Sequence, residues 1–233
     1  MFSIKHLSEP LLEFGGGGRH VDVRYGLMDF GPADFTTDKT KTLRLGVVGS
    51  AQSAGKLRDW LRKCEDGIPA KNSRQPTLFP AFPGSSMPGP FRCYFEVDDQ
   101  DVRTVSATAI SKITAEQDDE IAIGAAVVAF AAEVQSLAER DRPPQVIICA
   151  LPVELIERVS NMRATNDDEE DDEEQEEETT RRVERANANF RGALKAITLS
   201  YRVPIQLIWP TTYDNDAVVR RKLATYSTRR VQD

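Results

Sequence analysis

The sequence predicts an α/β protein with a Rossmann-like, mostly parallel sheet flanked by helices. First, short apolar runs alternate with longer segments whose apolar residues recur at helical spacing, which is the pattern of a parallel sheet. Second, residues 145–151 form a continuous apolar run, as expected for a strand that a parallel sheet buries on both faces. Third, 233 residues with 40% hydrophobic and 29% charged content suffice to bury such a core.

Residues 1–40 are predicted to be an extended lead-in rather than a domain. Residues 15–18 are all glycine, and residues 30–34 carry turn signals. Residues 41–49 then form a short apolar run that predicts the first core strand. In residues 53–61, apolar side chains at helical spacing follow a serine that we expect to cap a helix.

The middle of the chain continues the alternation after an irregular connection. Residues 68–90 contain six prolines, so they are expected to lack regular structure. Residues 92–97 predict a second strand, residues 102–113 are ambiguous, and residues 116–140 predict a long helix. The strand at residues 145–151 follows, and Pro152 opens another helix.

The last part of the α/β domain is predicted from one helix and one strand. Residues 183–200 predict a helix that turns Phe190, Leu194, Ile197 and Leu199 inward, and residues 204–209 predict a strand. We therefore expect a single α/β domain over residues 41–212. Residues 217–230 predict a short basic helix beyond it.

The charge is distributed unevenly along the chain. The formal net charge is −7, but eleven of the 37 acidic residues lie between positions 167 and 178, interrupted only by Gln175. From position 179 to the end there are eleven basic and four acidic residues, an excess of seven positive charges. Such an excess is a plausible footprint for a polyanion, although several of these bases suit a solvated helix face equally well.

The acidic run itself predicts a disordered insertion over residues 165–179. Its carboxylates repel one another and have no apolar face, so they cannot build a packed element. Calcium loops need alternating ligands and glycine at set positions, which this run lacks. A solvated loop is therefore favoured over a cation site.

Cysteine usage and the amino terminus favour the cytoplasm. Cys64, Cys93 and Cys149 are far apart and form no CxxC pair, so we expect three reduced thiols, the last two inside strands, and no structural zinc. No segment approaches the roughly 18 consecutive apolar residues of a membrane span. Residues 1–6 lack the apolar centre of a signal peptide.

Catalytic motifs are scarce in this sequence. Residues 49–56 (Gly-Ser-Ala-Gln-Ser-Ala-Gly-Lys) invite comparison with a phosphate-binding P-loop, but five residues instead of four separate the glycines, and Leu57 follows where Ser or Thr is required. The two histidines, His6 and His20, both lie in the lead-in, where nothing would hold an imidazole in place. We therefore predict that the chain catalyses nothing by itself.

Three polar residues near the carboxyl end suggest a phosphate site. Arg191 and Lys195 stand four apart in a predicted helix and so share one face of it. Gln206 follows in the next strand, after a turn at Val203-Pro204. Two cations and an amide donor suit a terminal phosphate, with Arg191 on the phosphate or stacked on the first base. Auxiliary nucleic-acid contacts are expected from Arg202, Arg220, Arg221 and Lys222.

These residues and several other segments resemble the prokaryotic Argonaute family. Residues 9–15 (Glu-Pro-Leu-Leu-Glu-Phe-Gly), with 24–27 (Arg-Tyr-Gly-Leu) and 30–32 (Phe-Gly-Pro), are similar to segments of this family. Residues 79–84 (Phe-Pro-Ala-Phe-Pro-Gly), 147–154 (Ile-Ile-Cys-Ala-Leu-Pro-Val-Glu) and 203–208 (Val-Pro-Ile-Gln-Leu-Ile) resemble parts of its MID domain. In that family the MID domain has a Rossmann-like fold and grips the 5′ end of a guide strand.

The resemblance implies a function and a set of partners. Arg191, Lys195 and Gln206 match the order and spacing of the family's guide 5′-phosphate ligands, although Ile205 stands where Ser or Thr is usual. The partners would be a small guide RNA or DNA, its complementary target, and a PIWI domain in cis or in trans. A magnesium ion joins guide phosphates in some members. The lead-in, residues 1–40, would pack on the PIWI domain.

Residues 213–233 resemble the opening of that PIWI domain. The family's fourth phosphate ligand and its nuclease carboxylates would lie beyond Asp233, so we expect a fragment of a longer protein or a natural split protein that does not cleave nucleic acid by itself. The alternative is a Rossmann-like interaction module that docks a partner protein through the acidic run. Deleting residues 167–178 would abolish docking in the second case and preserve guide binding in the first.

Overall fold

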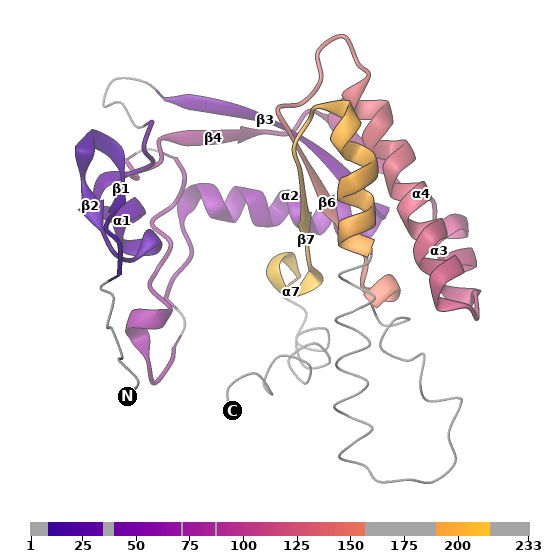
Figure 1. The fold of residues 1–233 in the computed structure, drawn as a ribbon, viewed down its shortest axis with the longest axis horizontal. Helices are drawn as coiled ribbons and strands as arrows, with labels where there is room; N and C mark the ends of the chain where they lie inside the picture. Colours follow the sequence, from indigo (N-terminus) through magenta and orange to yellow (C-terminus); the bar gives the residue numbers. More distant parts are fainter. Residues whose placement is uncertain (1–8, 35–39, 71, 87, 157–189, 215–233) are drawn as a thin grey trace, which may run out of the picture. The chain divides into compact units, whose positions relative to one another are not determined.

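The computed structural model describes residues 9–34, 40–70, 72–86, 88–156 and 190–214 (Figure 1). The chain divides into two compact units. A small unit comprises Met1–Leu43 with Leu61–Phe95, and a sheet unit comprises Arg44–Trp60 with Glu96–Asp233. The acidic run at residues 165–179, the basic residues 220–222 and the predicted helix at 217–230 lie outside the described residues.

The five-stranded sheet has the order β4-β3-β6-β7, with β5 also paired to β3. The pairings of β3 with β5, β3 with β6 and β6 with β7 are all parallel, which confirms the predicted mostly parallel α/β sheet. In β3 and β6 the register sets Val47 opposite Ile148, and both strands are largely buried apolar runs, as parallel sheets require. The strands are β3 (Lys41–Gly49), β4 (Cys93–Glu96), β5 (Val102–Thr104), β6 (Val146–Ala150) and β7 (Ile205–Ile208).

Helices flank this sheet, as predicted. The ambiguous segment 102–113 divides into β5 and the start of α3, because Ser106 accepts a hydrogen bond from the backbone N–H of Ala109 and caps the helix. The residue that precedes α2 and caps it is Ser50, one turn before the predicted Ser53, and each serine hydroxyl accepts from the other's backbone N–H. The helices are α2 (Ala51–Asp66), α3 (Ala107–Ala115), α4 (Asp119–Ala138), α7 (Pro210–Tyr213) and the helical residues 153–156 and 190–198.

The core lies between one face of the sheet and the helices α3, α4 and 190–198. Phe130 of α4 is fully buried there, and its ring meets that of Phe190 edge to face at a centroid distance of 5.7 Å. Ile147 and Leu207 contribute the sheet side of the same cluster. Burying a phenylalanine in such a cluster stabilises the fold by about 3 kcal/mol relative to exposing it.

The sequence predicted no segment long and apolar enough to span a membrane, but helix α4 is such a segment. Its 20 residues are long and apolar enough to cross a membrane by length and composition alone. A core helix of a soluble protein meets the same test. Phe130, Val134 and Leu137 of α4 are fully buried in the sheet unit, which accounts for one side of the helix.

The prediction of an extended lead-in is wrong for the described residues of the small unit. Strands β1 (Leu12–Glu13) and β2 (Arg19–His20) pair antiparallel, and α1 (Val23–Phe30) follows, capped by the Asp22 side chain. Gly16 and Gly17 adopt φ of 63° and 76°, which lets the chain turn between the strands within η1 (Gly15–Gly17). The glycine run therefore builds a tight turn rather than a flexible tether.

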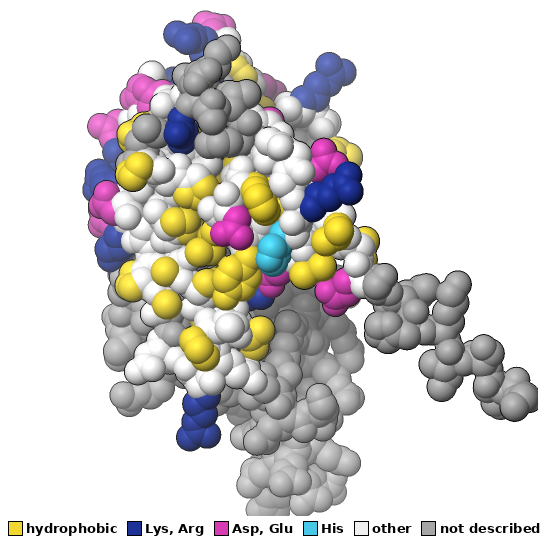
Figure 2. Space-filling view, turned by 90° about the vertical axis from the view of Figure 1, so that its left-hand side faces the viewer, with side chains coloured by type: hydrophobic (Ala, Val, Ile, Leu, Met, Phe, Trp, Pro, Cys, Tyr) yellow, Lys and Arg dark blue, Asp and Glu magenta, His cyan; other side chains and the backbone are white. Residues whose placement is uncertain are grey.

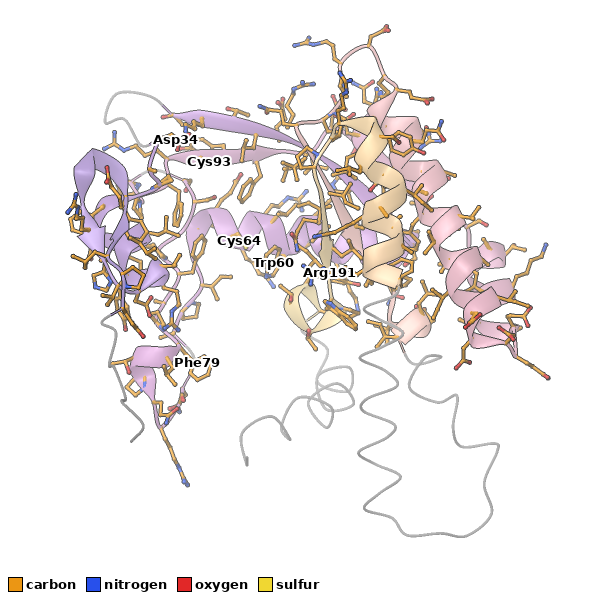
Figure 3. The ribbon with its side chains drawn as sticks, viewed as in Figure 1. Asp34, Trp60, Cys64, Phe79, Cys93 and Arg191 are labelled. Carbon is orange, nitrogen blue, oxygen red and sulfur yellow. The ribbon has the colours of Figure 1, made fainter. Side chains whose placement is uncertain are left out.

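Apolar side chains remain exposed on the small unit. Figure 2 shows hydrophobic groups gathered on the face of the molecule that carries this unit. The exposed side chains come from the hairpin, from α1 and from η2 (Pro76–Leu78) with its neighbour, and they are Leu11, Leu12, Val21, Val23, Phe30, Leu78 and Phe79. Phe79 is among the labelled side chains of Figure 3. A patch of this kind is typical of a surface that another protein surface covers.

Candidate nucleic-acid interface

The helix at residues 190–198 is held in one orientation by a buried stripe. Phe190, Leu194 and Thr198 recur every four residues and are between 0% and 8% exposed. The Thr198 hydroxyl donates to the Leu194 carbonyl oxygen at 2.8 Å, so its polar group is satisfied inside the helix. The predicted inward positions of Ile197 and Leu199 are wrong, because these side chains are 45% and 80% exposed at the edge of the stripe.

Arg191 and Lys195 share the flank beside this stripe. Each follows a stripe residue by one position, which is about 100° around the helix axis. Arg191 is exposed and Lys195 is half-buried, and Figure 3 shows Arg191 at the first turn of the helix. Within the described part of the chain neither side chain has a recorded ion pair with a carboxylate.

Gln206 lies on the opposite face of the sheet from this helix. Ile205 and Leu207 pack with the core that contains Phe190 and Leu194, and side chains alternate along a strand, so Gln206 between them points to the other face. Its side-chain amide donates to the Leu207 carbonyl oxygen at 2.9 Å. The structure thus brings Arg191 and Lys195 together but does not place Gln206 on their side of the sheet.

The strand β7, which carries Gln206, lies at one edge of the sheet. β7 is the last strand in the sheet order, so that edge carries no further strand among the described residues. Arg202 lies in the turn before β7 with a left-handed φ of 57°, and its side chain is exposed. Arg220, Arg221 and Lys222, the other auxiliary contacts predicted from the sequence, lie outside the described residues.

Residues 49–56, the segment compared with a P-loop, connect α2 to the end of β6 and to a residue that follows β7. Lys56, which the P-loop comparison had singled out, forms an ion pair with Asp214 at 2.6 Å, and the Asp214 side chain is only 4% exposed. The buried Ser53 hydroxyl donates to the Ala150 carbonyl oxygen at 3.0 Å, which links α2 to the end of β6. Sequence reasoning missed the Lys56–Asp214 pair, because 158 positions separate its members and no local pattern connects them.

Tyr213 closes the same end of the sheet. Its hydroxyl donates to the Leu151 carbonyl oxygen, and burial raises the pKa of this phenol well above its usual value. The phenol is therefore a neutral hydrogen-bond donor that anchors α7 against the residues after β6. We assign it no chemical step.

The three cysteines are free, buried thiols, as the sequence predicted, and Cys93 and Cys149 lie in β4 and β6. Burial raises the pKa of Cys64 to about 11 and that of Cys149 to about 12, and it also raises the pKa of Cys93. Thiols with raised pKa values are poor nucleophiles at neutral pH. Among the described residues there is no group of three His, Cys, Asp or Glu side chains placed to hold a metal ion.

Comparison with known protein families finds no family that matches this chain, and comparison with curated proteins finds none similar to it.

Proposed function

We propose that this chain binds the 5′-phosphorylated end of a small guide nucleic acid, as the MID-containing part of a prokaryotic Argonaute. The observation that carries the proposal is the position of Arg191 and Lys195. They are two cations on one flank of the helix 190–198, and neither is paired with a carboxylate among the residues that the structure describes. This helix is followed, after a short turn, by the sheet-edge strand β7. In this proposal the parallel-sheet unit is a MID-like domain, and the chain does not itself cleave nucleic acid.

The chemistry of a terminal phosphate suits this pair. A monoester phosphate carries up to two negative charges and several acceptor oxygens, and Lys195 supplies a compact point charge. Arg191 offers a planar fork that donates to phosphate oxygens or stacks on the first base. A magnesium ion that bridges guide phosphates would be held by the phosphates themselves in this proposal. Among the described residues, no three His, Cys, Asp or Glu side chains are grouped to hold it.

Gln206 could contact the same phosphate only if its side chain reached around the free edge of β7. Its amide would have to leave the Leu207 carbonyl oxygen, an exchange of hydrogen bonds that costs at most about 1 kcal/mol net. Gln206 is therefore assigned a secondary contribution, behind the two cations.

The exposed apolar side chains of the small unit support the proposed partner. Leu11, Leu12 and Val23 are each more than one third exposed, at the hairpin and at the start of α1. We assign this face to contact with a PIWI domain, in cis or in trans. The partner would complete the guide channel and bury the patch.

The experiment is a binding assay with two strands of identical sequence, one with a 5′-phosphate and one with a 5′-hydroxyl. Lys195→Ala is expected to weaken binding of the phosphorylated strand by about tenfold and to leave the hydroxyl strand nearly unchanged, because only the phosphate presents the paired charge. Gln206→Ala is expected to have a smaller effect of the same sign.

The matched control is Lys112→Ala on α3, which removes one exposed lysine of the same unit elsewhere. It should weaken both strands equally and slightly, through net charge alone. Equal losses for both strands in Lys195→Ala would reject a dedicated phosphate site.

A further inference from the structure

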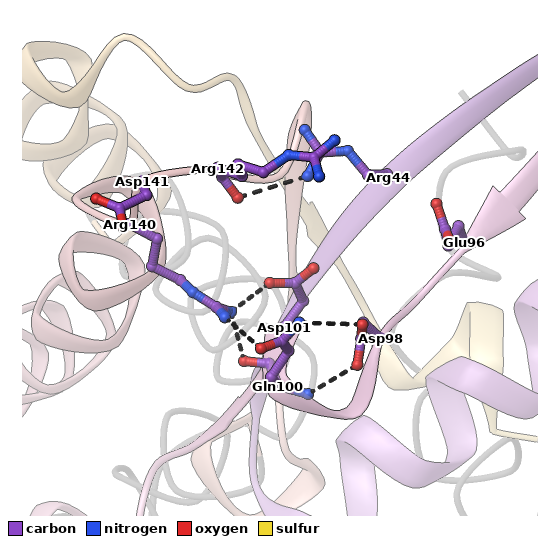
Figure 4. A pocket seen from close by; sticks show the side chains of 8 residues that line it. All are labelled: Arg44, Glu96, Asp98, Gln100, Asp101, Arg140, Asp141 and Arg142. Carbon is purple, nitrogen blue, oxygen red and sulfur yellow. Dashed lines mark hydrogen bonds and ion pairs between the residues drawn. The ribbon is translucent and has the colours of Figure 1, made fainter.

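A cavity of about 430 Å³ lies within the sheet unit, at the end where β6 begins (Figure 4). Arg44 reaches it from β3, where its backbone carbonyl accepts from the N–H of Gln145, just before β6. Glu96 at the end of β4, the turn between β4 and β5, and the turn between α4 and β6 supply the rest. Its lining residues are Arg44, Glu96, Asp98, Gln100, Asp101, Arg140, Asp141 and Arg142. None of the proposed guide contacts is among them.

One charge pair in this cavity is already satisfied. Arg140 forms an ion pair with Asp101, whose side chain is 8% exposed, and it also donates to the Gln100 carbonyl oxygen at 2.7 Å and to the Gln100 side-chain oxygen at 2.9 Å. These hydrogen bonds of the Arg140 guanidinium all go to Gln100 and Asp101, in the turn between β4 and β5. The pair therefore fastens that turn to the end of α4 and leaves no net charge for a ligand.

Two further arginines, Arg44 and Arg142, line the cavity, and the exposed Asp141 lies between Arg140 and Arg142 in the same turn. The Arg44 guanidinium donates to the carbonyl oxygens of Arg142 and Pro143, at 3.5 and 3.1 Å, and not to any carboxylate among the recorded ion pairs of the described residues. Arg142 lines the cavity as well, and its backbone carbonyl oxygen is one of the two groups to which Arg44 donates. An oxyanion that accepts from both guanidinium groups would balance their like charge.

The opposite wall is negative. Glu96 and Asp98 are exposed and lie across the cavity from the two arginines in Figure 4. The Asp98 side chain accepts from the backbone N–H of Gln100 and from its side-chain amide, at 3.4 and 3.1 Å, and no cation is paired with either carboxylate among the described residues. A cationic group would find two acceptors there.

We propose that this cavity binds a small free zwitterion that carries a phosphate at one end and an ammonium group at the other. Arg44 and Arg142 take the phosphate, and Glu96 with Asp98 takes the ammonium. The field between the walls orients such a ligand, and a purely anionic ligand is disfavoured by the carboxylates. A cavity of this volume suits a ligand of that size. This activity is additional to guide binding and does not depend on it.

The test is calorimetric titration of the full chain at low salt with O-phosphoethanolamine and with ethyl phosphate, which lacks the ammonium group. Phosphoethanolamine should bind about tenfold more tightly than ethyl phosphate, as one extra charge-assisted contact predicts. Arg142→Gln should weaken both probes by about tenfold. Glu96→Gln should weaken phosphoethanolamine alone, until the two probes bind alike.

The control variant is Arg103→Gln on β5, which removes the same charge from an arginine that pairs with Glu133 at 3.0 Å and does not line the cavity. It should leave both affinities unchanged, as should Lys195→Ala. The proposal is overturned if neither probe binds, if ethyl phosphate binds as tightly as phosphoethanolamine, or if Arg103→Gln and Arg142→Gln have equal effects. Sedimentation with phosphatidylethanolamine vesicles, lost in Arg142→Gln, would identify a lipid headgroup instead and would also overturn it.

Discussion

Gly49, the last residue of β3, lies where the backbone of β6 and a side chain of α2 both approach closely. A Cβ atom at this position would lie 2.5 Å from the Ser53 hydroxyl oxygen and 2.7 Å from the Ala150 carbonyl oxygen. Gly49→Ala is therefore expected to reduce the free energy of unfolding by about 1–3 kcal/mol through overpacking, as measured by urea denaturation.

Gly55, six positions on in α2, supplies the matched control. A Cβ there would meet no atom within 4 Å, so Gly55→Ala should instead stabilise the protein by about 0.5–1 kcal/mol, because alanine loses less backbone entropy in a helix. If both substitutions shift the denaturation midpoint in the same direction, the close approach at Gly49 is not as described.

The buried thiols give a pH dependence with a definite sign. The pKa of Cys64 is raised to about 11 and that of Cys149 to about 12, so the native state holds both as neutral thiols, whereas unfolded thiols titrate near pH 8.5. Their contribution to stability is complete below about pH 8.5 and falls as pH rises toward 11–12, because the unfolded state loses its protons first.

Urea denaturation at several pH values between 8 and 11 measures this loss of stability. Thiol labelling with a disulfide reagent at pH 8 tests the burial that causes the raised pKa values. The native protein should react slowly at Cys64, Cys93 and Cys149, which are all buried, and all three should react at once in denaturant. Fast labelling of the native protein would contradict the burial of these side chains.

Helix α4 separates core from surface positions within a few residues. Phe130 is fully buried against Phe190, whereas Val128 is 66% exposed on the same helix. Phe130→Ala is expected to cost about 3–5 kcal/mol of unfolding free energy, through lost transfer energy and the cavity left behind. Val128→Ala should change stability by no more than about 0.5 kcal/mol. Similar losses in chemical denaturation would show that α4 is packed in another orientation.

Regular elements with strong patterns could be predicted from the sequence. The apolar runs of β3 and β6 needed no tertiary information, and the long helix α4 was expected within a few residues of its bounds. The segment 102–113 was ambiguous because a short strand and a capped helix share it. The lead-in differs from the prediction because Gly16 and Gly17 use their positive φ in a tight turn, and because Asp22 caps a helix after it.

The candidate site could be predicted only in part. The common flank of Arg191 and Lys195 follows from helical periodicity, which the sequence displays. The face of Gln206 depends on the pleat of β7, and the alternation Ile205–Gln206–Leu207 was the available signal for it. The pair of Lys56 with Asp214 and the cavity wall of Arg44 with Arg142 join residues about 100 or more positions apart, and only the folded chain brings them together.

For the chain as a whole, guide binding as proposed requires a preference for a terminal phosphate. The measurement is the ratio of the dissociation constants of a 3′-labelled strand with a 5′-hydroxyl and with a 5′-phosphate, at one fixed salt concentration, by fluorescence anisotropy. We expect a ratio of about ten or more for the unaltered chain and about one for the Arg191→Ala/Lys195→Ala double variant. A ratio of one for the unaltered chain would contradict it.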